Sequence, residues 1–229
     1  MASNPYITPK LFSFLRDLKK NNTREWFQDN KSRYEEQVRE PLIAFVEDFS
    51  EHLPKISSHF VADPRKVGGS LFRIHRDIRF SKDKSPYKTH AGVHFRHERA
   101  KDVHAPGFYL HLDPAEVFIA AGIWHPDTPT LKLIRAAIGD DPKRWKQVAK
   151  SGAFKKHFTL AGESLKRAPA GFEPDDPLIE DLKRKDFIGV KDRTAKDATS
   201  PDFMKDFAAT CKAATSFTEF LTKATGLPF

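Results

Sequence analysis

The chain has 229 residues, a formal net charge of +8 at pH 7 and a single cysteine, Cys211. A chain of this length buries about 70% of its unfolded surface, so it needs no metal or disulfide to fold, and one cysteine excludes an intrachain disulfide. The 20 phenylalanines exclude a disordered chain. No apolar run is long enough for a signal peptide or a membrane span, so we expect a cytoplasmic protein without a membrane partner. We also expect one domain over residues 1–229, with Cys211 buried.

Pairs of a small polar residue and a proline predict helix starts. The polar side chain can accept a hydrogen bond from an unpaired N–H of the first turn, and the proline loses nothing, because its own N–H would be unpaired there. Apolar residues three and four apart follow each pair, as in an amphipathic helix. The pairs are Thr8-Pro9, Thr128-Pro129, Asp141-Pro142, Asp176-Pro177 and Ser200-Pro201.

The N-terminal part, about residues 8–53, is predicted to be helical. After the first helix, a second begins near Thr23, with Trp26 and Phe27 on its buried side, and a longer helical stretch follows up to residue 53. Pro41 interrupts this stretch, because proline disfavours the α conformation of the preceding residue and clashes with the turn before it. We therefore expect a break or kink there.

The apolar period changes from 3.6 to 2 in the centre of the chain, about residues 67–124, which predicts a sheet. Strands that follow one another without helices favour an antiparallel meander. The last strand is apolar on both faces and is therefore expected to be central, and Trp124 at its end is expected to lie in the core. The expected strands cover residues 71–80, 92–97, 108–112 and 117–124.

The C-terminal part, about residues 127–225, returns to a mainly helical pattern, and its final helix is expected from Pro201 to Ala224. Two short stretches within it, 158–165 and 187–190, also fit strands. The fold class is therefore α+β, with a central antiparallel sheet flanked by N-terminal and C-terminal helices.

The positive charge is concentrated in one part of the chain. Residues 65–104 hold eleven bases and four acids, so they account for +7 of the net charge of +8. Their densest part, Phe72 to His90, reads FRIHRDIRFSKDKSPYKTH. A concentrated positive field attracts anions, and arginine and lysine bind phosphate or carboxylate groups. This segment is therefore a candidate site for an anionic small molecule, such as a nucleotide, or for nucleic acid.

A strand over residues 71–80 would present several cations on its polar face, and the lysine-rich loop after it and the neighbouring strands would extend that face. An aromatic side chain there can stack on a base. The ligand-binding residues that we predict are Arg73, Arg76, Arg79, Lys82, Lys84, Tyr87, Lys88, Tyr109 and His111. The alternative is ordinary surface charge, in which the bases pair with Asp77 and Asp83 and contribute little to stability.

The loop at residues 82–88 is expected to be ordered, because Pro86 is stiff and Tyr87 can anchor it. Lys84 or Lys88 should then point over the same face as the polar side chains of the preceding strand.

Catalysis on a phosphorylated substrate is the alternative to binding. His75 would be the general base and Asp77 its orienting acid, although Asp77 can equally neutralise an arginine. The sequence contains no nucleophile elbow, P-loop or dinucleotide fingerprint, and we expect no cofactor. His90, His94 and His97 would converge only on a helix, which the predicted strand excludes, so no metal site is expected.

Several motifs have a distinctive sequence. They are REWF at Arg24–Phe27, RIHRDIRFSKDKSPYKTH at Arg73–His90, GFYLHL at Gly107–Leu112, GIWHP at Gly122–Pro126, LKRAPAGFEPDDP at Leu165–Pro177 and LKRKDF at Leu182–Phe187. In these motifs the chain resembles, along nearly its whole length, a bacterial family catalogued as domain of unknown function 2461. The resemblance implies an α+β fold and leaves the activity open. The segment His97–His104 is more charged than the family pattern, and we expect a variable hairpin tip there.

Overall fold

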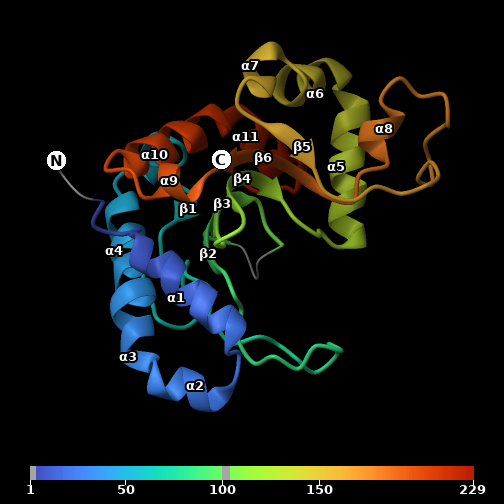
Figure 1. The fold of residues 1–229 in the computed structure, drawn as a ribbon. Coiled ribbons are helices and arrows are strands. Elements are labelled where there is room, and N and C mark those ends of the chain that lie inside the picture. Colours follow the sequence, from blue (N-terminus) through green and yellow to red (C-terminus); the bar gives the residue numbers. More distant parts are fainter. Residues whose placement is uncertain (1–3, 100–103) are drawn as a thin grey trace.

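The structure, a computed structural model, describes residues 4–99 and 104–229. Within these residues an antiparallel sheet of six strands runs in the order β1-β2-β3-β4-β6-β5 (Figure 1). The strands are β1 (Phe60–Val61), β2 (Ala91–His97), β3 (Gly107–Leu112), β4 (Val117–Ile123), β5 (Thr159–Ala161) and β6 (Phe187–Arg193). The predicted α+β class is confirmed, and β4 is central as expected. The sheet is larger than predicted, because β5 and β6 of the C-terminal part join it beside β4.

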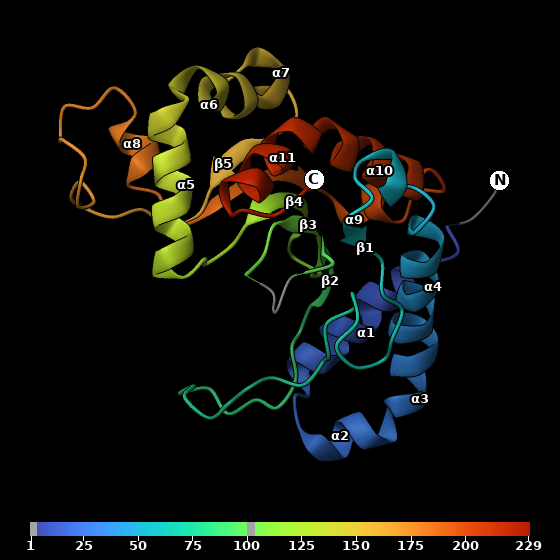
Figure 2. The same ribbon diagram turned by 180° about the vertical axis from the view of Figure 1, so that it is seen from behind.

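The helices form two groups, one at each end of the molecule (Figures 1 and 2). The N-terminal group contains α1 (Pro9–Lys20), α2 (Arg24–Asp29), α3 (Lys31–Tyr34), the π-helix η1 (Glu35–Arg39), α4 (Glu40–Phe49) and the 3₁₀-helix η2 (Leu53–Lys55). The later helices are α5 (Thr128–Asp140), α6 (Pro142–Ala149), α7 (Gly152–Lys155), α8 (Ile179–Leu182), α9 (Ala195–Ala198), α10 (Phe203–Ala213) and α11 (Thr215–Ala224). Within the described ranges, no helix combines the length and the apolar character needed to span a membrane.

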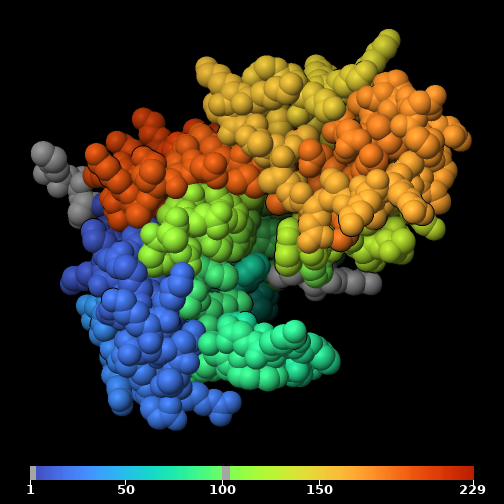
Figure 3. Space-filling model, turned by 45° about the vertical axis from the view of Figure 1, so that its right-hand side comes forward, coloured from blue at the N-terminus to red at the C-terminus, as the bar shows by residue number. Residues whose placement is uncertain are grey.

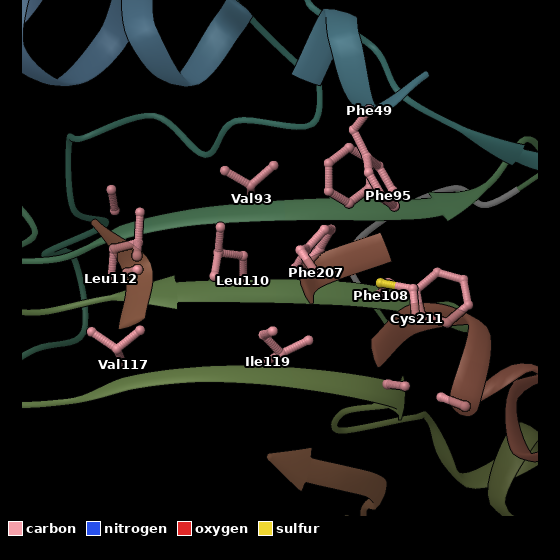
Figure 4. Packing of buried hydrophobic residues seen from close by; sticks show 14 of the residues in the cluster. Phe49, Val93, Phe95, Phe108, Leu110, Leu112, Val117, Ile119, Phe207 and Cys211 are labelled. Atoms are coloured by element: carbon pink, nitrogen blue, oxygen red, sulfur yellow. The ribbon is translucent and has the colours of Figure 1, made fainter. Parts of the chain in front are cut away.

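One face of the sheet is covered by helices from both ends of the chain. Alternate residues of β2, β3 and β4, such as Val93 and Leu110, point to this face and are fully buried (Figure 4). The ring centroid of Phe95 lies 4.5 Å from that of Phe49 in α4 and 5.7 Å from that of Phe207 in α10. Cys211 is buried beside Phe108, as predicted for a buried cysteine (Figure 4). Because α4 and α10 cover this face, the functional side chains have to lie on the opposite face or outside the sheet.

Two of the five predicted helix starts are accurate, and the start predicted at Ser200-Pro201 is wrong, because α10 begins at Phe203. Helices α1 and α6 begin at the expected prolines, and the carboxylate of Asp141 accepts a hydrogen bond from the Arg144 N–H at 2.9 Å. Helix α5 begins one residue early, with Asp127 as its cap. No helix begins at Asp176, because its carboxylate accepts from Leu178 N–H in a turn, and α8 starts three residues later.

Two further expectations about helices need correction. The helix expected to span Pro201 to Ala224 is divided into α10 and α11 at Ala214. At Pro41 the chain stays helical, since η1 leads directly into α4 and the proline lies in the first turn of α4. A missing N–H costs little at that position, so the change from π-helix to α-helix takes the place of the expected break.

The strand predicted at residues 71–80 is wrong. Residues 72–90, here called the arm, form an irregular hairpin that extends away from the sheet (Figures 1 and 2). Only single bridges occur, between Leu71 and Val93 and between His75 and Tyr87. The predicted alternation is present near the base, but Pro86 cannot donate to a ladder. At the tip the alternation has no core to face, so Phe80 is 95% exposed.

Trp124 also lies outside the core, contrary to the prediction. It follows the last residue of β4, is 51% exposed, and stacks on the ring of His125 with the centroids 4.2 Å apart. The hairpin tip expected at His97–His104 falls partly outside the described residues.

Candidate functional site

The arm is held at its base by the loop between α1 and α2. Tyr87 is 3% exposed, and its ring stacks on that of Phe27 at a centroid distance of 4.1 Å. The side-chain amide of Asn22 donates to the Tyr87 carbonyl at 2.9 Å, and its oxygen accepts from the Tyr87 N–H at 3.1 Å. Backbone hydrogen bonds from Arg76 to Pro86 and from Lys88 to Ile74 tie the two sides of the arm together. This agrees with the expectation that Tyr87 anchors the loop, but the buried ring is not free to stack on a ligand, contrary to its predicted place among the ligand-binding residues.

Two of the predicted ligand-binding arginines bind within the arm itself. The guanidinium of Arg76 donates to Asp83 and to the Ser85 carbonyl. Arg79 pairs with Asp77 at 2.6 Å, and this hydrogen bond lowers the pKa of the Asp77 carboxyl to about 2. Arg76 therefore stabilises the tip of the arm, and the ion-pair partner of Asp77 is Arg79.

His75 lacks the orienting acid that a catalytic role requires. Asp77 is bound to Arg79, and the exposed His75 ring packs against Tyr87 at a centroid distance of 5.2 Å and edge-on against Phe27 at 6.3 Å. Its role as a general base stays a prediction, without the partner that motivated it.

The remaining cations of the arm differ in their availability. Arg73 and Lys82 are exposed, and neither side chain makes a hydrogen bond or ion pair with residues 4–99 or 104–229. The Lys84 ammonium donates to the Ile78 carbonyl at 3.1 Å. Lys88 donates to the Arg73 carbonyl at 2.8 Å, and burial, followed by the charge of Arg73, lowers the pKa of its ammonium. Arg73 and Lys82 are thus the cations most available to a ligand.

The sheet face opposite α4 and α10 carries a group of rings. This group, here called the ring cluster, consists of Phe72, His90, His94, Tyr109, His111 and Phe118. The Tyr109 hydroxyl is hydrogen-bonded to His111 Nδ1 at 3.1 Å, and His111 stacks on Phe118 with the centroids 4.6 Å apart. Because Phe72 and His90 are the two ends of the arm, the arm and the ring cluster form one continuous surface. Tyr109 and His111, predicted from the sequence, therefore lie beside the base of the arm.

Tyr109 reaches its position because residue 92 is a glycine. A Cβ atom on Gly92 would lie 2.5 Å from the Tyr109 hydroxyl oxygen, closer than any real contact. The ring can therefore lie against the backbone of β2 only if that side chain is absent.

The ring cluster is uncharged at neutral pH. Burial, with smaller contributions from Arg96 and His104, lowers the pKa of His94 to about 4. Burial, followed by the charges of His111 and Lys88, lowers the pKa of His90 to about 4 as well. The partly exposed His90 and His111 therefore supply aromatic surface, whereas His94 is buried, and the arm supplies the positive charge.

The surface is hollowed between the arm and the C-terminal part of the chain (Figure 3). The arm stands on one side of this hollow, and the segment that leads through α8 stands on the other. In the described part of the chain, no cluster of three or more histidine, cysteine or acidic side chains has a geometry that could hold a metal ion.

The sequence analysis missed one further group, the pair formed by His125 and Asp186. Both residues fall within motifs noted above, GIWHP and LKRKDF. Their proximity depends on β4 pairing with β6, which places Ile123 opposite Phe187. The two residues lie 61 positions apart in the sequence, so no local pattern could indicate their contact.

The fold and the arm define a class of protein: an α+β protein whose antiparallel sheet carries a basic arm beside an uncharged ring cluster. The chain belongs to the family described as conserved hypothetical protein (DUF2461), whose model matches residues 10–220. The resemblance noted in the sequence is thereby confirmed. No curated protein and no solved structure matches the chain significantly.

Proposed function

We propose that the protein binds single-stranded nucleic acid along the arm and the ring cluster. The observation that carries this proposal is the composition of the arm, which combines the exposed, unpaired cations Arg73 and Lys82 with the almost fully exposed ring of Phe80. Proteins that bind single strands use this combination, because cations contact the phosphates and aromatic rings stack on the bases.

The shape of the arm supports a polymer over a mononucleotide. Phe80 lies near the middle of the arm's sequence, beyond the bridge between His75 and Tyr87, and Arg73 lies next to Phe72 at its base. A ligand that contacts both has to follow the length of the arm. The guanidinium of Arg79 lies over the Phe80 ring, 5.8 Å from its centroid, so charge and stacking surface meet at the tip.

A panel of fluorescent ligands tests the proposal. Single-stranded RNA and DNA, duplex DNA and ATP are titrated at low salt, and binding is followed by fluorescence anisotropy. We expect the single strands to bind most tightly and binding to weaken steeply with salt. If ATP binds as tightly as a longer strand, the ligand is a mononucleotide and not a polymer. If nothing in the panel binds, the proposal is refuted.

The double variant Arg73→Gln/Lys82→Gln locates the site. Neither side chain has a partner to lose within residues 4–99 and 104–229, so we expect weaker binding and an unchanged thermal unfolding midpoint. The matched control is Lys143→Gln/Lys146→Gln, which removes two exposed lysines from α6 at the far end of the molecule. Equal losses in both variants would show that binding follows net charge alone. A cytoplasmic location is part of the same proposal, and cell fractionation checks it.

A further inference from the structure

A buried carboxylate orients an exposed histidine at the end of β4. The side chain of Asp186 is 1% exposed, and one of its oxygens accepts hydrogen bonds from both the ring Nδ1 (2.7 Å) and the backbone N–H (2.8 Å) of His125. Its other oxygen accepts from the Glu163 N–H at 2.8 Å. Gly162 lets this loop close, since it has a φ of +100° and a Cβ there would lie 2.3 Å from that of Asp186.

The arrangement fixes which ring nitrogen of His125 can accept a proton. Burial opposes the ionisation of Asp186, but the hydrogen bonds from Glu163 and His125 outweigh it and hold the pKa of the carboxyl below its usual value. An ionised carboxylate at Nδ1 keeps the proton on that nitrogen and leaves the lone pair on Nε2. Nε2 has no hydrogen-bond partner among the described residues, and 44% of the side chain is exposed.

The backbone of His125 adopts a conformation that is uncommon for residues other than glycine. Its φ is +49°, and no other non-glycine residue within the described ranges has a positive φ. Glycine or asparagine would adopt this conformation more readily and would keep the backbone hydrogen bond to Asp186. Strained backbone of this kind is concentrated at functional sites.

The pair lies at the end of β4 that leads into α5. The segment between β4 and α5, which contains His125, lies across the gap from the arm (Figures 1 and 3). The Trp124 ring stacks on those of His125 and His104, and the charge of His104 contributes to the lowered pKa of His94 in the ring cluster. Glu163, whose pKa is lowered first by Lys185 and also by His125, pairs with Lys185 at 2.5 Å.

We propose that His125 is a general base that cleaves bound RNA, with Asp186 as its positioning residue; this rests on the proposed function. His125 Nε2 takes the proton of a ribose 2′-hydroxyl, the 2′ oxygen bonds to the adjacent phosphorus, and the bond from phosphorus to the 5′ oxygen breaks. The departing 5′ oxygen takes a proton from water, and the imidazolium returns its proton to the resulting hydroxide. The products are a 2′,3′-cyclic phosphate and a free 5′-hydroxyl. DNA, which lacks the 2′-hydroxyl, is bound and left intact.

The test compares binding and cleavage for three strands of the same sequence: RNA, DNA and 2′-O-methyl RNA. We expect all three to bind and only the RNA to be cleaved, with the cyclic phosphate identified by mass spectrometry. His125→Asn is the decisive variant, because asparagine tolerates the backbone conformation. It should keep binding and lose about 10²–10⁴-fold of the cleavage rate, the usual contribution of a general base.

The variant Asp186→Asn tests the positioning role. An amide has one accepting oxygen, so it can no longer accept from both Nδ1–H and the two backbone N–H groups; the proton is no longer held on Nδ1, and cleavage should fall while RNA binding stays unchanged. Ring ¹⁵N chemical shifts report the tautomer directly. Binding of RNA without cleavage by the wild type, or equal cleavage by His125→Asn, overturns the inference and leaves the proposed function standing. Failure of all three strands to bind overturns the proposed function instead.

Discussion

Replacing Asn22 with alanine should release the arm from the body of the protein. The Asn22 side chain makes two hydrogen bonds to the backbone of Tyr87, at 2.9 and 3.1 Å. Each is worth about 0.5–1.5 kcal/mol net, so the attachment should weaken by about 1–3 kcal/mol. For a chain of this size, a global loss of that amount lowers the melting temperature by roughly 2–12 °C.

Hydrogen exchange distinguishes local release from global destabilisation. The amides of Arg76 and Lys88 are hydrogen-bonded across the arm, so their exchange reports its opening. We expect roughly 5- to 150-fold faster exchange at these amides, the ratio that corresponds to 1–3 kcal/mol. The matched control is Asn21→Ala, because the side chain of Asn21 bonds only to the Asp17 carbonyl within its own helix end. Unchanged exchange in the arm of Asn22→Ala, or the same acceleration in the control, would refute the reasoning.

Three other outcomes are expected. Between pH 7 and pH 5 the unfolded chain protonates His94, whose ordinary pKa is 6.5, while the folded chain, in which its pKa is about 4, does not. The free energy of unfolding should therefore fall by about 2 kcal/mol over this range. In urea unfolding, His94→Gln should lose about 2 kcal/mol less than the wild type between these pH values, and an identical pH dependence would contradict the reasoning. Phe80→Ala should leave the melting temperature unchanged and raise the Kd for single-stranded RNA roughly 5- to 150-fold, since stacking contributes about 1–3 kcal/mol; an unchanged Kd would remove Phe80 from the site. Gly92→Ala should displace Tyr109 and cost about 1–3 kcal/mol in urea unfolding, whereas wild-type stability would show that the ring has room to move.

The strands that pack on the core were readable from the sequence. In β2 and β3 every second residue is apolar and buried, so the period of two survives in the structure. Residues 71–80 show the same period without forming a strand. The difference lies in the partner, because the returning side of the arm contains Pro86 and short polar residues that favour turns.

The candidate site could be predicted only in part, for reasons of the same kind. Local sequence identified the basic segment and the anchor Tyr87, which depend on neighbouring residues. It could not indicate that Asp77 pairs with Arg79 instead of His75, because both lie two residues away. It also could not reveal the contact of His125 with Asp186, which requires the pairing of β4 with β6.

The salt dependence of RNA binding tests the central claim most directly. Each cation that contacts a phosphate contributes about 0.7 to the slope of log K against log salt concentration for a single strand. We expect Arg73→Gln/Lys82→Gln to lower the slope of the wild type by about 1.4, and Lys143→Gln/Lys146→Gln to leave it unchanged. If the arm variant binds single-stranded RNA with the affinity and the slope of the wild type, the arm is not the binding site and the account is wrong.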